Sequence, residues 1–334
     1  MKKSQLTGPK TIQIVEQTIP ELDENEVLLK TIACGVCGSD LHAYNFSAGY
    51  EFVKKDVSLG HEVTAQVVDV GSNLSRNLIG KNVVVQAMNY CNRCESCKRG
   101  NYSLCKENKV LGLHFDGGLS EYFKVQEKYI DVLPDEIDLH LASLVEPLTI
   151  AIHAHKRLNE DLNGKTVLVQ GPGIIGLFVS LLAIKAGAKT YLSGLPVDKE
   201  KRLSQVKAWG GIPHVIGEDQ IDEQVDFIFE CSGAASALFS NTSLLKKSGK
   251  IVLVALYEKS TEFFFTPLVR NEWALIPSYG SDPEDFKIAI DFILANHEIL
   301  QSLPKFYPFE EVNQAFLDSL QKEVTKAIIK FEHE

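Results

Sequence analysis

Short runs of alternating and β-branched apolar residues characterise the first third of the chain. Residues 26–32, 63–70 and 81–86 are such runs, and glycine, serine or asparagine lies next to two of them. A period of two predicts strands, and turn residues between the runs predict hairpin-like connections. We therefore expect a β-rich domain at the beginning of the chain, an antiparallel barrel or a sandwich.

The pattern changes near Leu141, where predicted strands begin to alternate with predicted helices. Apolar strands are predicted at 165–170, 190–193, 225–230 and 250–254, with helices at 174–185 and 199–209. This alternation is typical of a doubly wound parallel sheet, so the fold class is α/β. From about residue 281 the sequence predicts helices at 286–295 and 309–320 and a last strand at 327–330.

Composition narrows the class of protein. The chain has 334 residues, so one large or two ordinary domains are expected, and 45% hydrophobic residues are ample for a core; its net charge is −10. The acidic charge argues against binding to a nucleic-acid backbone. The first residues contain no apolar signal segment, and no apolar run reaches membrane-spanning length, so we expect a cytoplasmic protein with no membrane partner.

Four of the seven cysteines lie in the segment 91–105, with the spacing C-x2-C-x2-C-x7-C. The residues between them are mostly polar, so this lobe has little to bury, and four close thiolates can enclose one structural zinc ion. An iron–sulfur cluster is the alternative metal, although its fourth cysteine would follow after three residues and precede proline. Plain thiols or disulfides are the third reading. The cysteines are Cys91, Cys94, Cys97 and Cys105.

A glycine motif joins the predicted strand 165–170 to the predicted helix 174–185. Its G-x-G-x-x-G pattern serves a tight turn, the close approach of a pyrophosphate and tight helix–strand packing. The free N–H groups of the helix N-terminus would bind the pyrophosphate. We expect a dinucleotide site here, and an ordinary glycine-rich turn is the alternative. The residues are Gly171, Gly173, Ile174, Ile175 and Gly176.

The acidic residue that usually holds the ribose of NAD is missing at the end of the next strand. Ser193 and Gly194 occupy that position. Because an acid would repel a 2′-phosphate, its absence favours NADP without excluding NAD. Ser193 is a candidate hydrogen-bond partner of the phosphate, and Arg202, Lys199 or Lys201 could neutralise it. The alternative is that these cations form a solvated helix face.

A second group of candidate metal ligands comes from Cys37-Gly-Ser-Asp-Leu-His42 and Gly60-His61-Glu62. Cysteine, histidine and carboxylate are all zinc ligands, and three protein ligands with one open position are typical of a catalytic zinc. Taken alone, His61 could be an ordinary satisfied histidine, and Cys34 with Cys37 could be a redox pair.

These motifs, in this order, resemble those of the zinc-dependent medium-chain alcohol and polyol dehydrogenases. The resemblance covers essentially the whole chain, including residues 116–122, and Glu146 in Leu-Val-Glu-Pro-Leu resembles the sorbitol and threonine dehydrogenase branch. It implies a GroES-like β-rich catalytic domain (residues 1–145 and 281–334, with the zinc lobe 91–105) and a Rossmann domain (residues 146–280). The active site would lie between them, and the chain would form a homodimer or homotetramer.

The resemblance also implies roles for individual residues. Two zinc ions per chain are expected, and Cys34 would be a plain buried thiol. Cys231 would lie at a strand end beside the nicotinamide, or else be simply a small buried residue. Glu62 would be a direct or exchanging ligand. Glu146 would bind zinc directly or through water, or else simply cap the helix that Pro147 begins. The implied catalytic ligands are Cys37, His61, Glu62 and Glu146, and the implied structural ligands are Cys91, Cys94, Cys97 and Cys105.

The implied reaction is hydride transfer between a secondary alcohol or polyol and NAD(P). Zinc would polarise the alcohol oxygen, and its proton would pass along Ser39 and the cofactor ribose to His42. Two other classes of protein stay open: a dinucleotide-binding sensor or structural protein without dehydrogenase activity, and a zinc-finger-like module, which the acidic charge disfavours.

Overall fold

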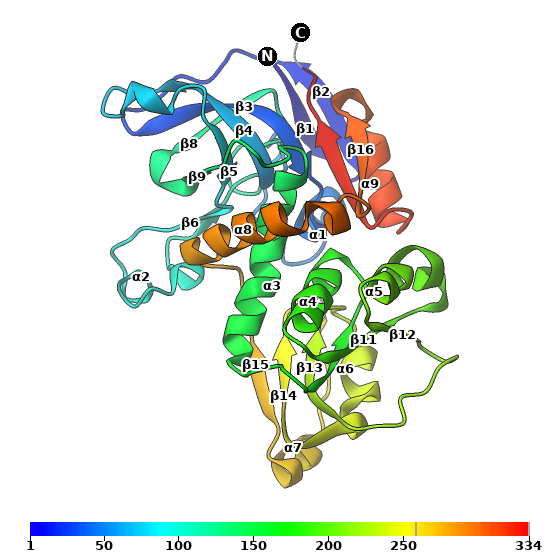
Figure 1. The fold of residues 1–334 in the computed structure, drawn as a ribbon. Helices are drawn as coiled ribbons and strands as arrows, with labels where there is room; N and C mark the ends of the chain where they lie inside the picture. The colour runs from blue at the N-terminus through cyan, green and yellow to red at the C-terminus, as the bar shows by residue number, and fades with distance from the viewer. Residues whose placement is uncertain (258, 333–334) are drawn as a thin grey trace. The chain divides into compact units, whose positions relative to one another are not determined.

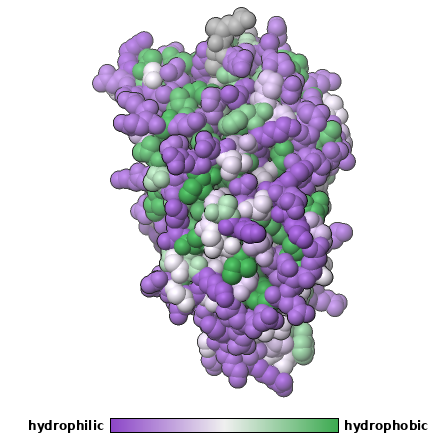
Figure 2. Space-filling view, turned by 45° about the vertical axis from the view of Figure 1, so that its right-hand side comes forward, coloured by the Kyte–Doolittle hydropathy of each residue, from purple (hydrophilic) through white to green (hydrophobic). Residues whose placement is uncertain are grey.

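The computed structural model describes residues 1–257 and 259–332, which form two compact units. Unit 1 consists of Met1–Thr149 and Ser281–Glu334, and unit 2 of Ile150–Gly280. Helix α3 (Val145–Leu158) runs across the first boundary in the chain (Figure 1). Among the described residues no helix is long and apolar enough to cross a membrane. On the face drawn in Figure 2, hydrophobic residues form small groups among hydrophilic ones.

A mixed sheet of seven strands forms the centre of unit 1. Its order is β16-β17-β3-β4-β5-β9, and β8 pairs with β3 outside this path. All pairs are antiparallel except β16 with β17. The strands are β3 (Glu26–Gly35), β4 (Glu62–Val70), β5 (Asn82–Val85), β8 (Tyr122–Gln126), β9 (Ile130–Val132), β16 (Pro304–Pro308) and β17 (Lys326–Lys330).

Among the described residues, unit 1 also contains two short two-stranded sheets and four α-helices beside the shared helix α3. The long strands β3 and β4 bury apolar residues such as Val27, Leu29 and Val67 in one core, and α9 packs against β17. The small sheets are β1 (Lys2–Gly8) with β2 (Thr11–Glu16), and β6 (Met88–Asn89) with β7 (Lys109–Val110). The helices are α1 (Gly38–Tyr44), α2 (Glu95–Lys98), α8 (Pro283–Leu300) and α9 (Val312–Leu320).

Unit 2 is built on a six-stranded parallel sheet with the order β12-β11-β10-β13-β14-β15. The central strand β10 is buried throughout, which explains its continuous apolar sequence. Helix α4 packs against β10 and β11, and α5 packs against β12. The strands are β10 (Thr166–Gln170), β11 (Lys189–Gly194), β12 (Ile212–Val215), β13 (Val225–Glu230), β14 (Leu245–Leu253) and β15 (Ala274–Pro277). The helices are α4 (Ile174–Lys185), α5 (Ser204–Ala208), α6 (Ala235–Ser240) and α7 (Phe265–Asn271).

The predicted fold class is confirmed, and most predicted elements lie within a few residues of their observed bounds. The helix predicted at 174–185 is α4. The helix predicted at 199–209 is divided, because residues Lys199–Leu203 form a wider π-helical turn before α5. The hairpin β1–β2 was not predicted, because Leu6 is the one large apolar residue of β1, although Lys3 and Ser4 are buried there as well.

Candidate metal and dinucleotide sites

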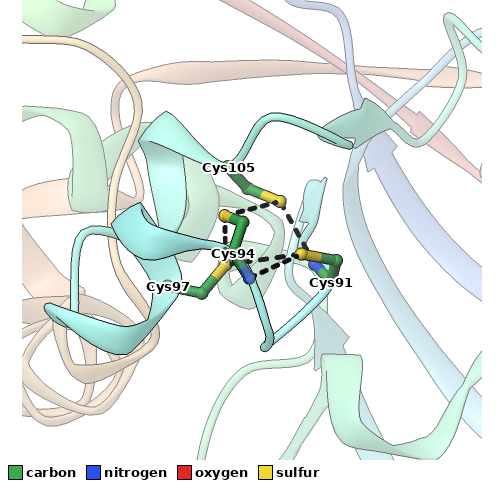
Figure 3. A group of neighbouring side chains, drawn as sticks. All are labelled: Cys91, Cys94, Cys97 and Cys105. Carbon is green, nitrogen blue, oxygen red and sulfur yellow. Dashed lines mark hydrogen bonds between the residues drawn. The ribbon is translucent and has the colours of Figure 1, made fainter.

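The four lobe cysteines converge around one point in unit 1. Their Sγ atoms lie 3.5 Å apart between Cys94 and Cys97 and 4.0 Å apart between Cys91 and Cys97 and between Cys94 and Cys105. Thiolates at about 2.3 Å from a tetrahedral zinc lie about 3.8 Å from one another. The lobe is therefore a structural zinc site, and the spacing-based prediction is confirmed (Figure 3).

Backbone N–H groups in the lobe point at the sulfur atoms. The N–H groups of Cys91 and Glu107 donate to Cys105 Sγ at 3.2 and 3.3 Å, and that of Cys94 donates to Cys91 Sγ at 3.3 Å. The N–H groups of Cys97 and Lys106 lower the pKa of the Cys94 thiol to about 6, whereas burial raises the pKa of Cys97 to about 12. These N–H donors stabilise the thiolate, which is the form of cysteine that binds metal.

The second group of candidate ligands is organised by Asp40, a fully buried carboxylate on α1. Its Oδ2 accepts the backbone N–H of Cys37 at 2.9 Å, and its Oδ1 accepts the N–H of Gly60 at 3.1 Å. Its Oδ1 also lies 3.6 Å from Nδ1 of His61. One carboxylate therefore positions two candidate ligands that are far apart in the sequence.

His61 is almost completely buried, and its Nε2 lies 3.2 Å from Ser39 Oγ. Burial alone would lower its pKa, but the negative groups of Asp40, Cys37 and Glu146 raise it well above the ordinary value. So much negative charge around one imidazole fits a divalent cation, and sulfur, nitrogen and oxygen donors suit zinc.

Glu146 lies in the first turn of α3 and is also buried. Burial raises the pKa of its carboxyl group to about 7, although the neighbouring His61 opposes this effect. The side chain therefore lies within electrostatic reach of His61, where the family resemblance would place a metal ligand.

Glu62 is turned toward a different partner. Its carboxylate forms an ion pair with the buried ammonium group of Lys326 on β17, and Lys326 also donates to the carbonyl of Val36 at 2.9 Å. Among the described residues, the four candidates do not bring three ligand atoms within 4.8 Å of one another, as the lobe cysteines do. The candidates are Cys37, His61, Glu62 and Glu146.

His42 begins a row of stacked rings. The ring centroids of His42 and Tyr50 lie 5.2 Å apart, those of Tyr50 and Phe52 5.9 Å, and those of Phe52 and His114 4.7 Å. The interplanar angles are 25–27°. His114 Nδ1 accepts the N–H of Val110 at 3.0 Å, which fixes that ring.

The three glycines of the predicted dinucleotide loop have distinct surroundings. Gly171 has a φ of +97°, and a Cβ there would lie 2.8 Å from Ser232. A Cβ on Gly176 would overlap the carbonyl of Gly171, so a side chain is excluded at the helix–strand contact. A Cβ on Gly173 would meet nothing within 4 Å, and Gly173 precedes the free N–H groups of α4, with Ile174 and Ile175 in its first turn. This open approach fits a pyrophosphate.

The candidate ribose contacts differ from one another. The Ser193 hydroxyl is buried and lies 2.9 Å from His214 Nδ1, so it is already engaged inside unit 2. A Cβ on Gly194 would lie 2.8 Å from Pro172 Cγ and 3.3 Å from Asp198 Cβ. Asp198 Oδ1 pairs with Arg202 at 3.2 Å, which places this acid and base beside Gly194.

Two buried charged residues beside the candidate catalytic ligands, Asp40 and Lys326, were not assigned a role from the sequence. Asp40 lies within the Cys37–His42 motif, and its place three residues after Cys37 was the available signal. Lys326 carried no signal, since a lysine in a terminal strand is normally exposed. Cys34 is fully buried as expected, whereas Cys231 is half-buried.

Two family models match the chain. One is described as "Alcohol dehydrogenase GroES-like domain" and matches residues 23–135. The other is described as "Zinc-binding dehydrogenase" and matches residues 175–295. Together they include the lobe cysteines, Cys37, His61 and most of α4.

Similar proteins match over most of their length. The sorbitol dehydrogenase of Bacillus subtilis (strain 168) is 33% identical over 270 residues, 77% of this chain and 75% of that protein. The D-arabitol-phosphate dehydrogenase of Enterococcus avium is 29% identical over 339 residues, covering 98% and 96%. The crystal structure of L-idonate 5-dehydrogenase from Escherichia coli K-12 has a TM-score of 0.90 at 27% identity, covering 99% and 98%.

Proposed function

Because this chain belongs to the zinc-containing medium-chain alcohol dehydrogenase family, we propose that it transfers a hydride between a secondary alcohol or polyol and NAD(P). The observation that carries the proposal is the group of side chains around the buried carboxylate of Asp40 in unit 1. It combines a thiol, an imidazole and a carboxylate, while unit 2 carries an open glycine loop at a helix N-terminus.

Cys37, His61 and Glu146 are the proposed ligands of a catalytic zinc. When bound, zinc supplies a Lewis acid for the alcohol oxygen and the nicotinamide accepts the hydride. Asp40 orients His61 and the backbone of Cys37. Glu62, which is paired with Lys326, is proposed as an exchanging ligand or as a neighbour that balances charge.

Ser39 and His42 are proposed to carry the proton away from the alcohol. Ser39 Oγ lies 3.2 Å from His61 Nε2, which places this hydroxyl at the candidate ligands. His42 follows three residues later on the same short helix and stacks on Tyr50. Residues three apart lie on neighbouring positions of a helix surface, so a short relay from Ser39 toward His42 is geometrically reasonable.

For the cofactor we propose NADP, or dual use of NADP and NAD. Gly194 offers no carboxylate to the ribose. Asp198 lies beside Gly194, and Arg202 forms an ion pair with Asp198, so Arg202 is near the expected ribose position. Since the Ser193 hydroxyl is bound to His214, Arg202 is the better candidate for the 2′-phosphate. Asp198 could instead accept from ribose hydroxyl groups, which would favour NAD.

A polyol is the proposed substrate class. The names of two relatives, sorbitol dehydrogenase and D-arabitol-phosphate dehydrogenase, refer to such compounds. The test is a panel of polyols, polyol phosphates and simple secondary alcohols with each dinucleotide, following reduced nicotinamide by absorbance. Turnover of a polyol with either dinucleotide supports the proposal. Dinucleotide binding without turnover of any alcohol would favour the sensor or structural alternative.

The homodimer or homotetramer and the cytoplasmic location stay predictions. Sedimentation of the purified chain would decide the first, and the second rests only on the sequence pattern.

A further inference from the structure

Glu230, the last residue of β13, is a buried carboxylate that none of the sites above uses. It has no exposed surface. In the sheet it lies opposite Gln170, which immediately precedes the glycine loop, and on its other side opposite Leu253 of β14. It therefore lies between the strand that leads into the glycine loop and the strand that leads to Tyr257.

The carboxylate accepts hydrogen bonds from both sides. Oε1 accepts the backbone N–H of Ser232 at 2.8 Å, the Ser232 hydroxyl, and the N–H of Gly233 at 3.2 Å. Oε2 accepts the hydroxyl of Tyr257 at 2.6 Å. Burial and the Glu230 carboxylate raise the pKa of this hydroxyl, which keeps it a donor. The backbone carbonyl of Glu230 also accepts the N–H groups of Val254 and Ala255 at 2.9 and 3.1 Å.

The turn that Glu230 holds abuts the glycine loop. Ser232 is the residue that a Cβ on Gly171 would meet at 2.8 Å, and Gly233 has a φ of +70° with the carbonyl of Leu256 close to it. Cys231 N–H donates to the carbonyl of Gln170 at 2.9 Å. The turn is therefore packed between the first glycine of the loop and segment 255–257.

Burial of an ionised carboxylate is unfavourable unless hydrogen-bond donors replace its water. Here the donors come from the turn and from one tyrosine, so the position of the turn and the stability of the carboxylate depend on each other. If the carboxylate became an amide, one of its oxygen acceptors would become a donor facing other donors. The turn would then shift against Gly171.

We propose that Glu230 is a positioning residue for dinucleotide binding, and that Tyr257 fixes its carboxylate so that the Ser232–Gly233 turn supports the glycine loop. The inference rests on the proposed dinucleotide site. According to this inference, Glu230 and Tyr257, which lie outside the glycine motif, contribute to the affinity for the dinucleotide.

The test compares Tyr257→Phe and Glu230→Gln with Tyr191→Phe in the purified full chain. Tyr191→Phe is a matched control because the Tyr191 hydroxyl also donates to a glutamate of unit 2, Glu223, at 2.6 Å. Titration with NADH and NADPH, followed by nicotinamide fluorescence, gives the Kd. We expect Tyr257→Phe to raise the Kd about 3- to 10-fold and Glu230→Gln about 10-fold or more, with Tyr191→Phe unchanged.

Steady-state rates separate positioning from general destabilisation. The KM for dinucleotide should rise in parallel with the Kd, whereas kcat and the KM for alcohol at saturating dinucleotide stay within about twofold. An unchanged Kd for dinucleotide in Tyr257→Phe would overturn the inference. This holds even if Tyr257→Phe and Tyr191→Phe both have a lower Tm than the unmodified chain. If Glu230→Gln does not fold, Tyr257→Phe decides alone. Failure of the unmodified chain to bind either dinucleotide would instead overturn the proposed cofactor site.

Discussion

Asp40 Oδ1 lies 3.6 Å from Nδ1 of His61, and the other oxygen of the same carboxylate accepts the N–H of Cys37. The two candidate zinc ligands come from different segments of the chain, the start of α1 and the loop before β4. A buried acid that contacts both fixes their separation and favours one orientation of the imidazole ring.

Asp40→Asn should therefore weaken the catalytic metal site. Loss of such a supporting carboxylate typically lowers metal affinity or activity about 10- to 100-fold. Competition with a chelator measures the affinity, and kcat measures the activity. Asp116→Asn is the control, because Asp116 accepts the N–H of Ser58 at 2.8 Å near the same loop without serving His61. Equal metal affinity in the two variants would contradict the role given to Asp40.

Cys94→Ser should mainly destabilise the protein. The four lobe cysteines form a closed group, and a structural zinc contributes directly to folding free energy. We expect elemental analysis to show two zinc ions in the unmodified chain and one in the variant, with a lower Tm. A variant that melts normally but loses all activity would point to a catalytic lobe.

His61→Ala and His42→Ala should have different effects. His61→Ala removes a proposed ligand and should abolish turnover, whereas dinucleotide binding in unit 2 should remain. His42→Ala should lower kcat by about 10²- to 10⁴-fold without loss of metal, because it removes only a proton relay. Metal analysis and nicotinamide fluorescence on both variants check this order. Loss of zinc from His42→Ala would reverse the assignment.

Arg202→Gln should reduce the preference for NADP. If Arg202 binds the 2′-phosphate, loss of this charge-assisted contact should raise the KM for NADPH about 10-fold and leave that for NADH unchanged. Lys207→Gln, which removes an exposed cation on α5, is the control. A strong NAD preference of the unmodified chain would contradict the NADP proposal.

Gly194→Asp is a poor test of the same question. A Cβ at this position would lie 2.8 Å from Pro172 Cγ, within the glycine loop. The substitution would therefore disturb pyrophosphate binding together with ribose recognition, and a change in cofactor preference could not be assigned to the new acid.

Asp318 should stabilise unit 1 in a pH-dependent way. Hydrogen bonds from Tyr307, Lys305 and Gln314 lower its pKa from 3.8 to about 2. A carboxyl group with a lowered folded-state pKa contributes stability above its unfolded pKa and loses it as the pH falls toward the folded value. The difference in urea stability between the unmodified chain and Asp318→Asn should thus be largest above about pH 4 and shrink toward pH 2. A constant difference would contradict this prediction.

The local features of this protein could be predicted from its sequence. The continuous apolar run of β10, the glycines after it and the period of α4 are all encoded within about twenty consecutive residues. The lobe cysteines are equally local, because four ligands within one short loop can reach a common metal without help from the rest of the fold. The order of the motifs along the chain indicated the family, and the family resemblance indicated the expected roles of individual residues.

Tertiary structure decided which polar groups are engaged and by what partner. Glu62 pairs with Lys326 because β17 pairs with β3, which also pairs with β4, and no local pattern records that arrangement. From the sequence, Ser193 was a candidate contact of the 2′-phosphate. In the structure β12 pairs with β11, and His214 on β12 lies against the Ser193 hydroxyl. Glu230 was an ordinary strand end in the sequence. Its importance follows from burial and from donors on both sides, which depend on strand order and register rather than on neighbouring residues.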